Sequence, residues 1–215
     1  SSIQWLSKTE LAELIQQMPQ RPMLAGQDGL RLSLAGAQDK LPVRVAMAED
    51  GSTGASVGLP ALGYPSTFIL KPPIPDITDS VGNEYFCMSL AAEVGLYSPK
   101  TIMLRTLSPL ITALIIARYD RLKIDASSIE RLHQEDFCQA LGVASDIKYE
   151  NEGGPSLEDC FKLIRSATNA SATSILSLLD YVLFNTLVGN HDAHGKNFSI
   201  LYQAGKAKLA PLYDC

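Results

Sequence analysis

The sequence has no long hydrophobic run, and no stretch approaches the roughly 18 consecutive apolar residues that a transmembrane helix needs. It also lacks a CxxC pair, because its four cysteines lie far apart at Cys87, Cys138, Cys160 and Cys215. Such cysteines form neither a disulfide framework nor a zinc knuckle, so we expect reduced thiols in a cytoplasmic protein. The formal net charge of −5 excludes a general attraction to nucleic acid or to an anionic membrane.

A signal peptide and a starting methionine are absent from the N-terminal end. The sequence stops at 209–215, an apolar strand-like run with no closing element. We therefore expect a fragment of a longer protein. Its 215 residues are enough for one large domain or for two small lobes around a shared cleft.

Apolar residues alternate in some segments and recur at helical spacing in others, which predicts the elements of the chain. In the first part we expect a helix over 7–18, two strands joined by a turn at Gly36 over 31–46, a surface loop over 49–67, a strand over 67–71, a helix over 79–94, and strands over 101–104 and 112–119. In the second part we expect helices over 133–141, 157–167 and 174–188 and a hairpin over 198–213.

This order of elements predicts an α+β fold with a strand-rich part followed by a helix-rich part. We divide the chain into a helical remnant or linker over 1–25, a strand-rich N-lobe with one helix over 26–118, and a helical C-lobe over 119–215.

The densest polar cluster is 189–197, which follows an apolar helix and precedes a strand. Asp192 and Asn197 stand in a D-x-x-x-x-N arrangement, the spacing of the catalytic loop of protein kinases. In those enzymes the aspartate accepts the proton of the acceptor hydroxyl and the asparagine holds magnesium. The alternative is a plain turn in which Asp192 and Asn197 cap backbone groups.

A second carboxylate, Asp214, follows the predicted hairpin, where the metal-binding aspartate of a kinase would lie. Lys71 ends an apolar strand and is a candidate for the phosphate-binding lysine, with Glu84 of the next helix as its partner. Each of these residues also has a simpler interpretation: a turn residue for Asp214, a surface lysine for Lys71 and a surface acid for Glu84.

A candidate phosphate-binding turn lies between the first two predicted strands of the hairpin over 31–46. Its residues are Ser33, Leu34, Ala35, Gly36, Ala37, Gln38, Asp39 and Lys40. Backbone N–H groups in such a turn, together with Lys40, can bind an anion. The turn has only one glycine, so an ordinary hairpin remains the alternative.

Several blocks, in this order, resemble the HipA-type serine/threonine kinases, the toxins of bacterial toxin–antitoxin pairs. The blocks are 33–40, 68–72, 83–91, 117–121, 133–136, 189–197 and 209–214. The resemblance runs from about Leu32 to the last residue. It implies a bilobal protein-kinase-like fold with an incomplete C-lobe, and ATP and Mg²⁺ as cofactors.

The resemblance also implies roles for individual residues. Asp192 is the expected catalytic base, and Asn197 and Asp214 are the expected magnesium ligands. The expected nucleotide contacts are Ala35, Gly36, Ala37, Gln38, Asp39, Lys40, Lys71, Ala117, Arg118, Tyr119, His194, Lys196, Asn197, Tyr213 and Asp214. Ser33 matches the serine that such kinases autophosphorylate, and a phosphate of about −2 charge there would disfavour ATP.

Partners follow from the same resemblance. Family members phosphorylate an aminoacyl-tRNA synthetase, and a helix-turn-helix antitoxin of the HipB type restrains them, so we expect contact with DNA only through the antitoxin. Two other functions stay open. One is a pseudokinase or interaction fragment that is inactive through truncation. The other is a metallohydrolase that binds zinc or manganese through His191, Asp192 and His194.

Overall fold

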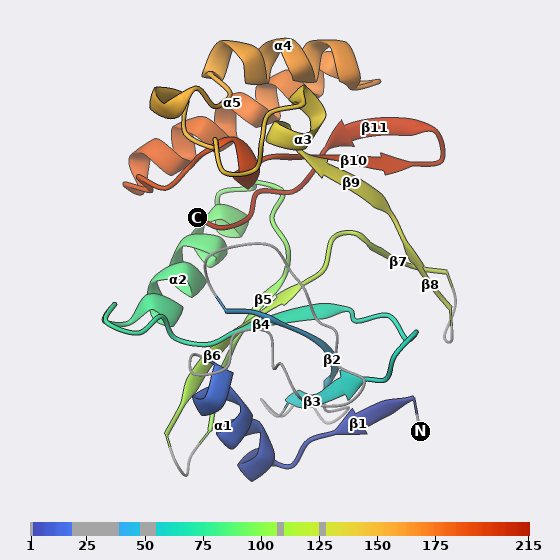
Figure 1. Cartoon of the computed structure of the whole chain (residues 1–215), viewed down its shortest axis with the longest axis vertical. Helices are drawn as coiled ribbons and strands as arrows, with labels where there is room; N and C mark the ends of the chain where they lie inside the picture. The colour runs from blue at the N-terminus through green and yellow to red at the C-terminus, as the bar shows by residue number, and fades with distance from the viewer. Residues whose placement is uncertain (1, 19–38, 48–54, 107–109, 125–127) are drawn as a thin grey trace. The chain divides into compact units, whose positions relative to one another are not determined.

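The computed structural model of the chain describes residues 2–18, 39–47, 55–106, 110–124 and 128–215. It divides into two compact units (Figure 1). The first unit comprises Ser1–Phe86 and Lys100–Arg118, and the second comprises Cys87–Pro99 and Tyr119–Cys215. Strands and helices occur in both units, so the predicted α+β fold is confirmed.

The described part of the first unit is built on a six-stranded sheet in which every pair of neighbours is antiparallel. The strands run in the order β1-β3-β2-β4-β6-β5. Their bounds are β1 (Ile3–Trp5), β2 (Leu41–Met47), β3 (Ala55–Pro60), β4 (Phe68–Lys71), β5 (Thr101–Arg105) and β6 (Thr112–Ala117). The predicted strand over 67–71 is thus a central strand of the sheet.

Helix α1 (Lys8–Gln17) confirms the amphipathic helix predicted over 7–18. It begins at a capping box, in which the Ser7 side chain accepts from the Glu10 N–H and the Glu10 side chain accepts from the Ser7 N–H. Its apolar face buries Leu11 and Ile15 in one cluster with apolar residues of β2, β3, β4 and β6. Burial of one such side chain contributes about 1.5–3 kcal/mol.

Helix α2 (Ser80–Glu93) is continuous, although the boundary between the two units falls inside it. In the first unit, Val81 packs with Leu114 and Ile116 of β6. In the second unit, Met88 and Ala91 belong to the main core cluster.

The second unit contains the remaining elements. Two small sheets are described, β9-β10-β11 and the pair β7-β8. The bounds are β7 (Arg121–Lys123), β8 (Ile129–Arg131), β9 (His133–Asp136), α3 (Phe137–Leu141), η3 (Glu150–Glu152), α4 (Leu157–Ala167), α5 (Ser171–Leu187), η4 (Gly195–Asn197), β10 (Ser199–Gln203) and β11 (Lys206–Leu209).

Helices α4 and α5 lie side by side over the β9-β10-β11 sheet (Figure 1). Ile164 of α4, Leu178 of α5 and Ile200 of β10 are fully buried in one core. A capping box at Ser156 and Asp159 fixes the start of α4, which has the bounds predicted from the sequence.

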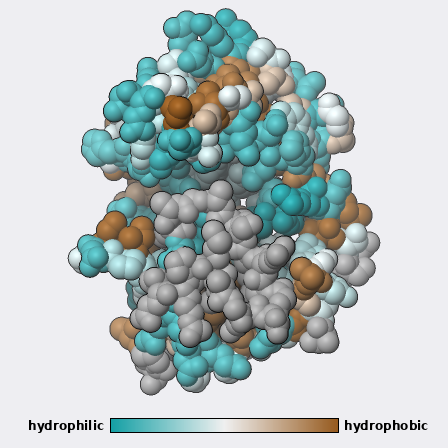
Figure 2. All heavy atoms as spheres, in the orientation of Figure 1, coloured by the Kyte–Doolittle hydropathy of each residue, from teal (hydrophilic) through white to brown (hydrophobic). Residues whose placement is uncertain are grey.

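The face of the second unit seen in Figure 2 is mostly hydrophilic, with a smaller hydrophobic area between hydrophilic groups. Helix α5 also carries exposed leucines at 176, 179, 183 and 187. Among the residues that the structure describes, no helix is both long and apolar enough to cross a membrane.

Two predicted segments are wrong. The loop expected over 49–67 contains strand β3, in which Val57 and Leu59 are buried against the sheet. The helix expected over 133–141 is strand β9 followed by the short helix α3. The helix cannot extend further back because the Asp136 side chain caps it by accepting from the Gln139 N–H.

Candidate active site

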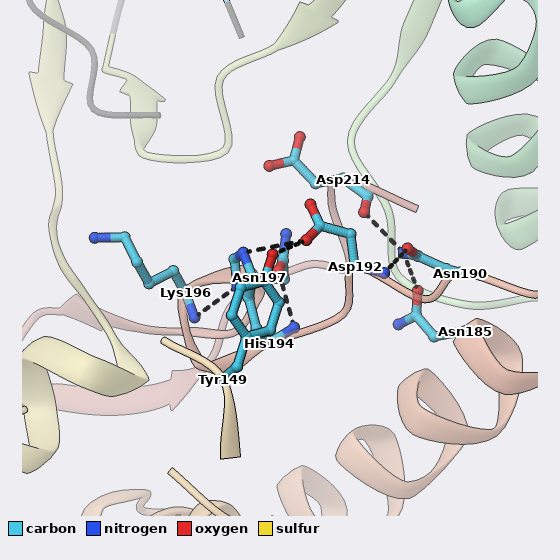
Figure 3. Close-up of polar contacts among 8 residues, drawn as sticks. All are labelled: Tyr149, Asn185, Asn190, Asp192, His194, Lys196, Asn197 and Asp214. Atoms are coloured by element: carbon cyan, nitrogen blue, oxygen red, sulfur yellow. Dashed lines mark hydrogen bonds and ion pairs between the residues drawn. The ribbon is translucent and has the colours of Figure 1, made fainter. Parts of the chain in front are cut away.

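The polar cluster 189–197 forms the connection between α5 and β10 in the second unit (Figure 3). Gly189, with φ +74°, lets the chain turn at the end of α5. The connection ends in the single turn η4, whose capping box joins His194 and Asn197. The D-x-x-x-x-N segment is therefore a folded loop with fixed ends.

Asn190 links this loop to its neighbours on both sides. Its Nδ2 donates to Asn185 Oδ1 at 2.8 Å and to the backbone oxygen of Asp214 at 3.1 Å, and its Oδ1 accepts from the Asp192 N–H at 3.1 Å. Asn185 is itself buried in α5 and donates to the Tyr181 carbonyl at 2.9 Å. One amide side chain therefore holds the helix end, the loop and the terminal segment together.

The Asp192 side chain is 71% exposed. The hydroxyl of Tyr149 donates a hydrogen bond to its Oδ1, and His194 Nε2 lies 3.9 Å from the same oxygen. In Figure 3 this carboxylate extends away from the Asn185–Asn190 pair. An exposed carboxylate with a fixed backbone is suited to accept a proton from a hydroxyl group.

Asn197 is buried, and its Oδ1 accepts from the His194 N–H at 3.0 Å. An amide oxygen has two lone pairs, so this bond leaves one for a further partner. The backbone is tightly packed beside it, because a Cβ on Gly195 would lie 2.9 Å from Pro155 Cγ and 3.0 Å from Cys138 Sγ.

Lys196 lies on the same turn, but its side chain extends away from Asp192 (Figure 3). Its Nζ is 3.5 Å from Asp136 Oδ2, and both side chains are largely buried. This ion pair connects the loop to the end of β9 within the second unit.

Burial lowers the pKa of His194, with a further contribution from the Lys148 ammonium. A neutral imidazole agrees with its bonding, since Nδ1 accepts from the Lys196 N–H at 3.3 Å. In the described ranges no group of three or more histidine, cysteine, aspartate or glutamate side chains is arranged to hold a metal ion. His191, Asp192 and His194, the set considered for the alternative metallohydrolase, are therefore not arranged as a metal site in these ranges.

The terminal segment places Tyr213 and Asp214 beside this loop. The Tyr213 hydroxyl donates to the Lys196 carbonyl at 2.8 Å and lies 2.6 Å from Ser199 Oγ, and its ring stacks on Tyr119 with centroids 5.7 Å apart. Burial raises the pKa of Tyr213 well above its ordinary value, so the phenol remains protonated.

Asp214 has φ +56°, which is uncommon for a residue with a side chain. Its carbonyl faces Asn190 and its carboxylate extends to the other side (Figure 3). Backbone strain of this kind costs of order 1–3 kcal/mol and is concentrated at functional sites.

In the first unit, Lys71 at the end of β4 forms an ion pair with Glu84 of α2, with Nζ 2.6 Å from Oε1. The side chains are only 8% and 15% exposed. This confirms the partner that the sequence indicated for Lys71.

Of the expected nucleotide contacts Ala117, Arg118 and Tyr119, the first two are held within the first unit. The Ala117 N–H donates to the Lys100 carbonyl and the Arg118 N–H to the Thr67 carbonyl, both at 2.9 Å. Tyr119, by contrast, belongs to the second unit.

The predicted phosphate-binding turn is described only at its end, where Asp39 and Lys40 are half-buried just before β2. Ser33, Ala35, Gly36, Ala37 and Gln38 lie outside the described residues, so their predicted roles stay predictions.

In the second unit the structure therefore brings together Asp192, His194, Lys196, Asn197, Tyr213 and Asp214. The sequence reasoning missed Asn190, Asn185 and Tyr149. Asn190 lies inside the polar cluster that the sequence singled out, and this position was a usable signal. Tyr149 gave none, because it is far from the cluster in the sequence.

The fold and this loop define an α+β protein of the protein-kinase-like class. The HipA-like C-terminal domain family matches residues 32–215, and the chain belongs to this family. The match covers both the Lys71–Glu84 pair and the loop with Asp192 and Asn197.

Two relatives cover nearly the whole chain. The Sinorhizobium fredii protein named "Putative kinase Y4mE" is 46% identical over 213 residues, which are 97% of this chain and 48% of the relative. The Shewanella oneidensis serine/threonine-protein kinase toxin HipA is 30% identical over 217 residues, covering 95% of this chain and 47% of the relative. The chain thus spans about half the length of the curated relatives it matches.

Solved structures agree on the fold. A chain from the Shewanella oneidensis complex of HipA, HipB and operator DNA has a TM-score of 0.74 at 28% identity, covering 100% of this chain and 50% of that one. The Helicobacter pylori proinflammatory kinase CtkA has a TM-score of 0.52 at 19% identity, covering 72% of this chain and 52% of that one. The second likeness bears on the fold alone.

Proposed function

We propose that this chain carries the ATP and magnesium site of a serine/threonine protein kinase of the HipA type. The observation that carries the proposal is the hydrogen-bonded loop in which Asn190 joins Asp192 to the backbone of Asp214. Asn197 belongs to the same loop, where its amide oxygen caps the turn η4. A base and two oxygen donors in one fixed assembly are what phosphoryl transfer to a hydroxyl requires.

In this proposal Asp192 is the catalytic base. Its carboxylate accepts the hydroxyl proton of the acceptor serine or threonine as the hydroxyl oxygen bonds to the γ-phosphorus and the bond to the leaving ADP oxygen breaks. Removing such a base typically lowers the rate by about 10²–10⁴-fold.

Asn197 and Asp214 fit a magnesium ion by their chemistry. Magnesium prefers hard oxygen donors and takes few of them from the protein. The Asp214 carboxylate and the second lone pair of Asn197 Oδ1 supply such donors. When bound, magnesium supplies positive charge to the β- and γ-phosphates.

In the first unit, Glu84 holds the Lys71 ammonium in an ion pair, and the role proposed for Lys71 is to bind the nucleotide phosphates. The remaining nucleotide contacts keep the roles predicted for them: residues 35–40 at the phosphates, Ala117, Arg118 and Tyr119 at adenine, and His194, Lys196 and Tyr213 along the nucleotide. Ser33 is the proposed autophosphorylation site.

The proposed substrate is a protein, for which the family resemblance suggests an aminoacyl-tRNA synthetase. The proposed partner is a helix-turn-helix antitoxin of the HipB type, with DNA contact only through it. The similarity to a chain of the Shewanella oneidensis HipA, HipB and operator DNA complex supports an antitoxin partner. The cytoplasmic location stays a prediction.

Phosphotransfer by the full-length protein tests the assignment of Asp192. We expect Asp192→Asn to lower the rate by at least about 10²-fold at unchanged nucleotide affinity, because the base acts in the chemical step. Asp180→Asn, which alters an exposed aspartate of α5, is the matched control and should leave the rate unchanged. A wild-type rate in Asp192→Asn would remove the assignment.

A further inference from the structure

Tyr149 lies far from the catalytic loop in the sequence, yet its hydroxyl donates a hydrogen bond to Asp192 Oδ1 (Figure 3). We infer that Tyr149 is a positioning residue for the Asp192 base. Its phenol holds one carboxylate oxygen and leaves the other for the hydroxyl group of the protein substrate. This inference rests on the kinase function proposed above.

The exposure of Asp192 makes such a contact necessary. Its backbone is fixed by Asn190, but its side chain is 71% exposed, so packing does little to select one rotamer. A reacting group must lie within about 3–3.5 Å of its partner and in the right orientation. A hydrogen bond to one oxygen restricts both torsions of the short aspartate side chain.

Tyr149 is itself anchored. Its carbonyl accepts from the Glu152 N–H at 3.0 Å and from the Gly154 N–H at 2.8 Å, which closes a tight turn. A Cβ on Gly154 would lie 2.7 Å from the Tyr149 carbonyl oxygen, so this turn requires glycine. The phenol is therefore presented from a fixed backbone.

The same turn is attached to the loop that it serves. The Gly195 N–H donates to the Lys148 carbonyl at 3.2 Å, and the Tyr149 ring meets the His194 ring edge-on, with centroids 5.1 Å apart. The turn that carries Tyr149 is thus attached twice to the loop that carries Asp192: the Lys148 carbonyl bonds the Gly195 N–H, and the Tyr149 ring contacts the His194 ring. A phenol held in this way keeps its place relative to the carboxylate.

The phenol also remains a donor over the pH range in which a kinase works. The hydrogen bond to the Asp192 carboxylate raises the pKa of Tyr149 above its ordinary value. The Lys148 ammonium lies 4.9 Å from the ring centroid and opposes this effect only in part. The phenol therefore keeps its proton at neutral and mildly alkaline pH.

The test compares Tyr149→Phe with Tyr202→Phe in the full-length protein. The Tyr202 hydroxyl donates to Glu135 Oε2 at 2.8 Å, so both variants lose one phenol–carboxylate bond, but only the first loses it at the base. We expect Tyr149→Phe to lower kcat about tenfold with the KM for ATP and the unfolding midpoint unchanged. Tyr202→Phe should keep the wild-type kcat.

A double-mutant cycle with Asp192→Asn separates positioning from a structural role. A positioning residue acts only through its base, so adding Tyr149→Phe to Asp192→Asn should change the residual rate less than twofold. Equal losses in the two backgrounds would overturn the positioning role, as would a Tyr149→Phe enzyme with wild-type or higher kcat. If Asp192→Asn itself keeps the wild-type rate, the kinase proposal fails and this role fails with it.

Discussion

The Lys71 ammonium and the Glu84 carboxylate lie 2.6 Å apart in the first unit, and both side chains are largely withdrawn from water. The sequence places them on different elements, Lys71 at the end of β4 and Glu84 in α2. A buried ion pair adds little net stability, but removal of one partner leaves the other charge uncompensated. Mutation of this pair should therefore affect both the free energy of unfolding and phosphotransfer, and suitable variants can separate the two effects.

We predict that Glu84→Gln and Lys71→Met each lower the free energy of unfolding by up to about 3 kcal/mol, because each leaves one buried charge. The double variant Lys71→Met/Glu84→Leu should recover most of this loss, since it leaves no charge unpaired. All three variants should lose phosphotransfer, because Lys71→Met removes the ammonium and Glu84→Gln removes the carboxylate that orients it. Urea unfolding and a phosphotransfer assay measure the two effects.

The exposed pair Glu158–Lys162 on α4 is the matched control, with the same N–O distance of 2.6 Å. Glu158→Gln should change neither stability nor rate appreciably, because water screens an exposed pair. Full activity in the Lys71→Met/Glu84→Leu protein would contradict the role of Lys71.

Asn190 gives a second prediction. Asn190→Asp keeps an acceptor for the Asp192 N–H but loses both donated bonds and places a negative charge beside the Asp214 carbonyl. We expect kcat to fall about 10–100-fold, the usual effect of removing a group that orients metal ligands. Steady-state kinetics of the full-length protein provide the measurement.

Asn169→Ala is the control for this prediction. Asn169 Oδ1 accepts from the Ala207 N–H at 2.6 Å, so an amide-to-backbone bond is lost there too, but away from the loop. If Asn169→Ala loses as much kcat as Asn190→Asp, the loss in Asn190→Asp reflects reduced stability and not a role in the site. An unchanged kcat in Asn190→Asp would remove Asn190 from the site.

Much of the architecture follows from local patterns. The capping boxes of α1 and α4 and the apolar spacing behind them predict both helices, and the apolar strand before Lys71 predicts β4. The ion pair with Glu84 could also be predicted, because kinases pair such a lysine with an acid of the next helix.

The features that were missed depend on distant partners. Strand β9 forms because His133–Asp136 pairs with β10, which lies far along the chain, and local sequence carries no trace of that pairing. Strand β3 is obscured by glycine, serine and proline, although Val57 and Leu59 alternate in it. The contact of Tyr149 with Asp192 likewise joins two loops that no periodicity connects.

Cys160 gives a prediction for alkaline pH. Burial raises its pKa from 9.0 to about 12, so the folded protein keeps a proton that the unfolded chain loses. The stability from this effect is fully present below pH 9 and is lost as the pH rises toward 12. Between pH 8 and 10.5 the free energy of unfolding should fall more steeply in the wild type than in Cys160→Ala.

Urea unfolding of both proteins at several pH values measures this difference, and the other titrating groups are common to the two. Native Cys160 should also resist thiol reagents at pH 8.5 and react once urea unfolds the chain, because the thiolate is the reactive form. If the free energy of unfolding fell equally steeply with pH in the two proteins, or if native Cys160 were labelled rapidly, the raised pKa of Cys160 would be contradicted.

The magnesium dependence of ATP binding tests the central claim most directly. Calorimetric titration of the purified chain with ATP should show binding that is at least tenfold tighter with Mg²⁺ than with EDTA. Asp214→Asn should remove this difference, and Asp180→Asn should preserve it. Absence of ATP binding, or equal affinity with and without Mg²⁺ in the wild type, would contradict a nucleotide site built on Asn197 and Asp214.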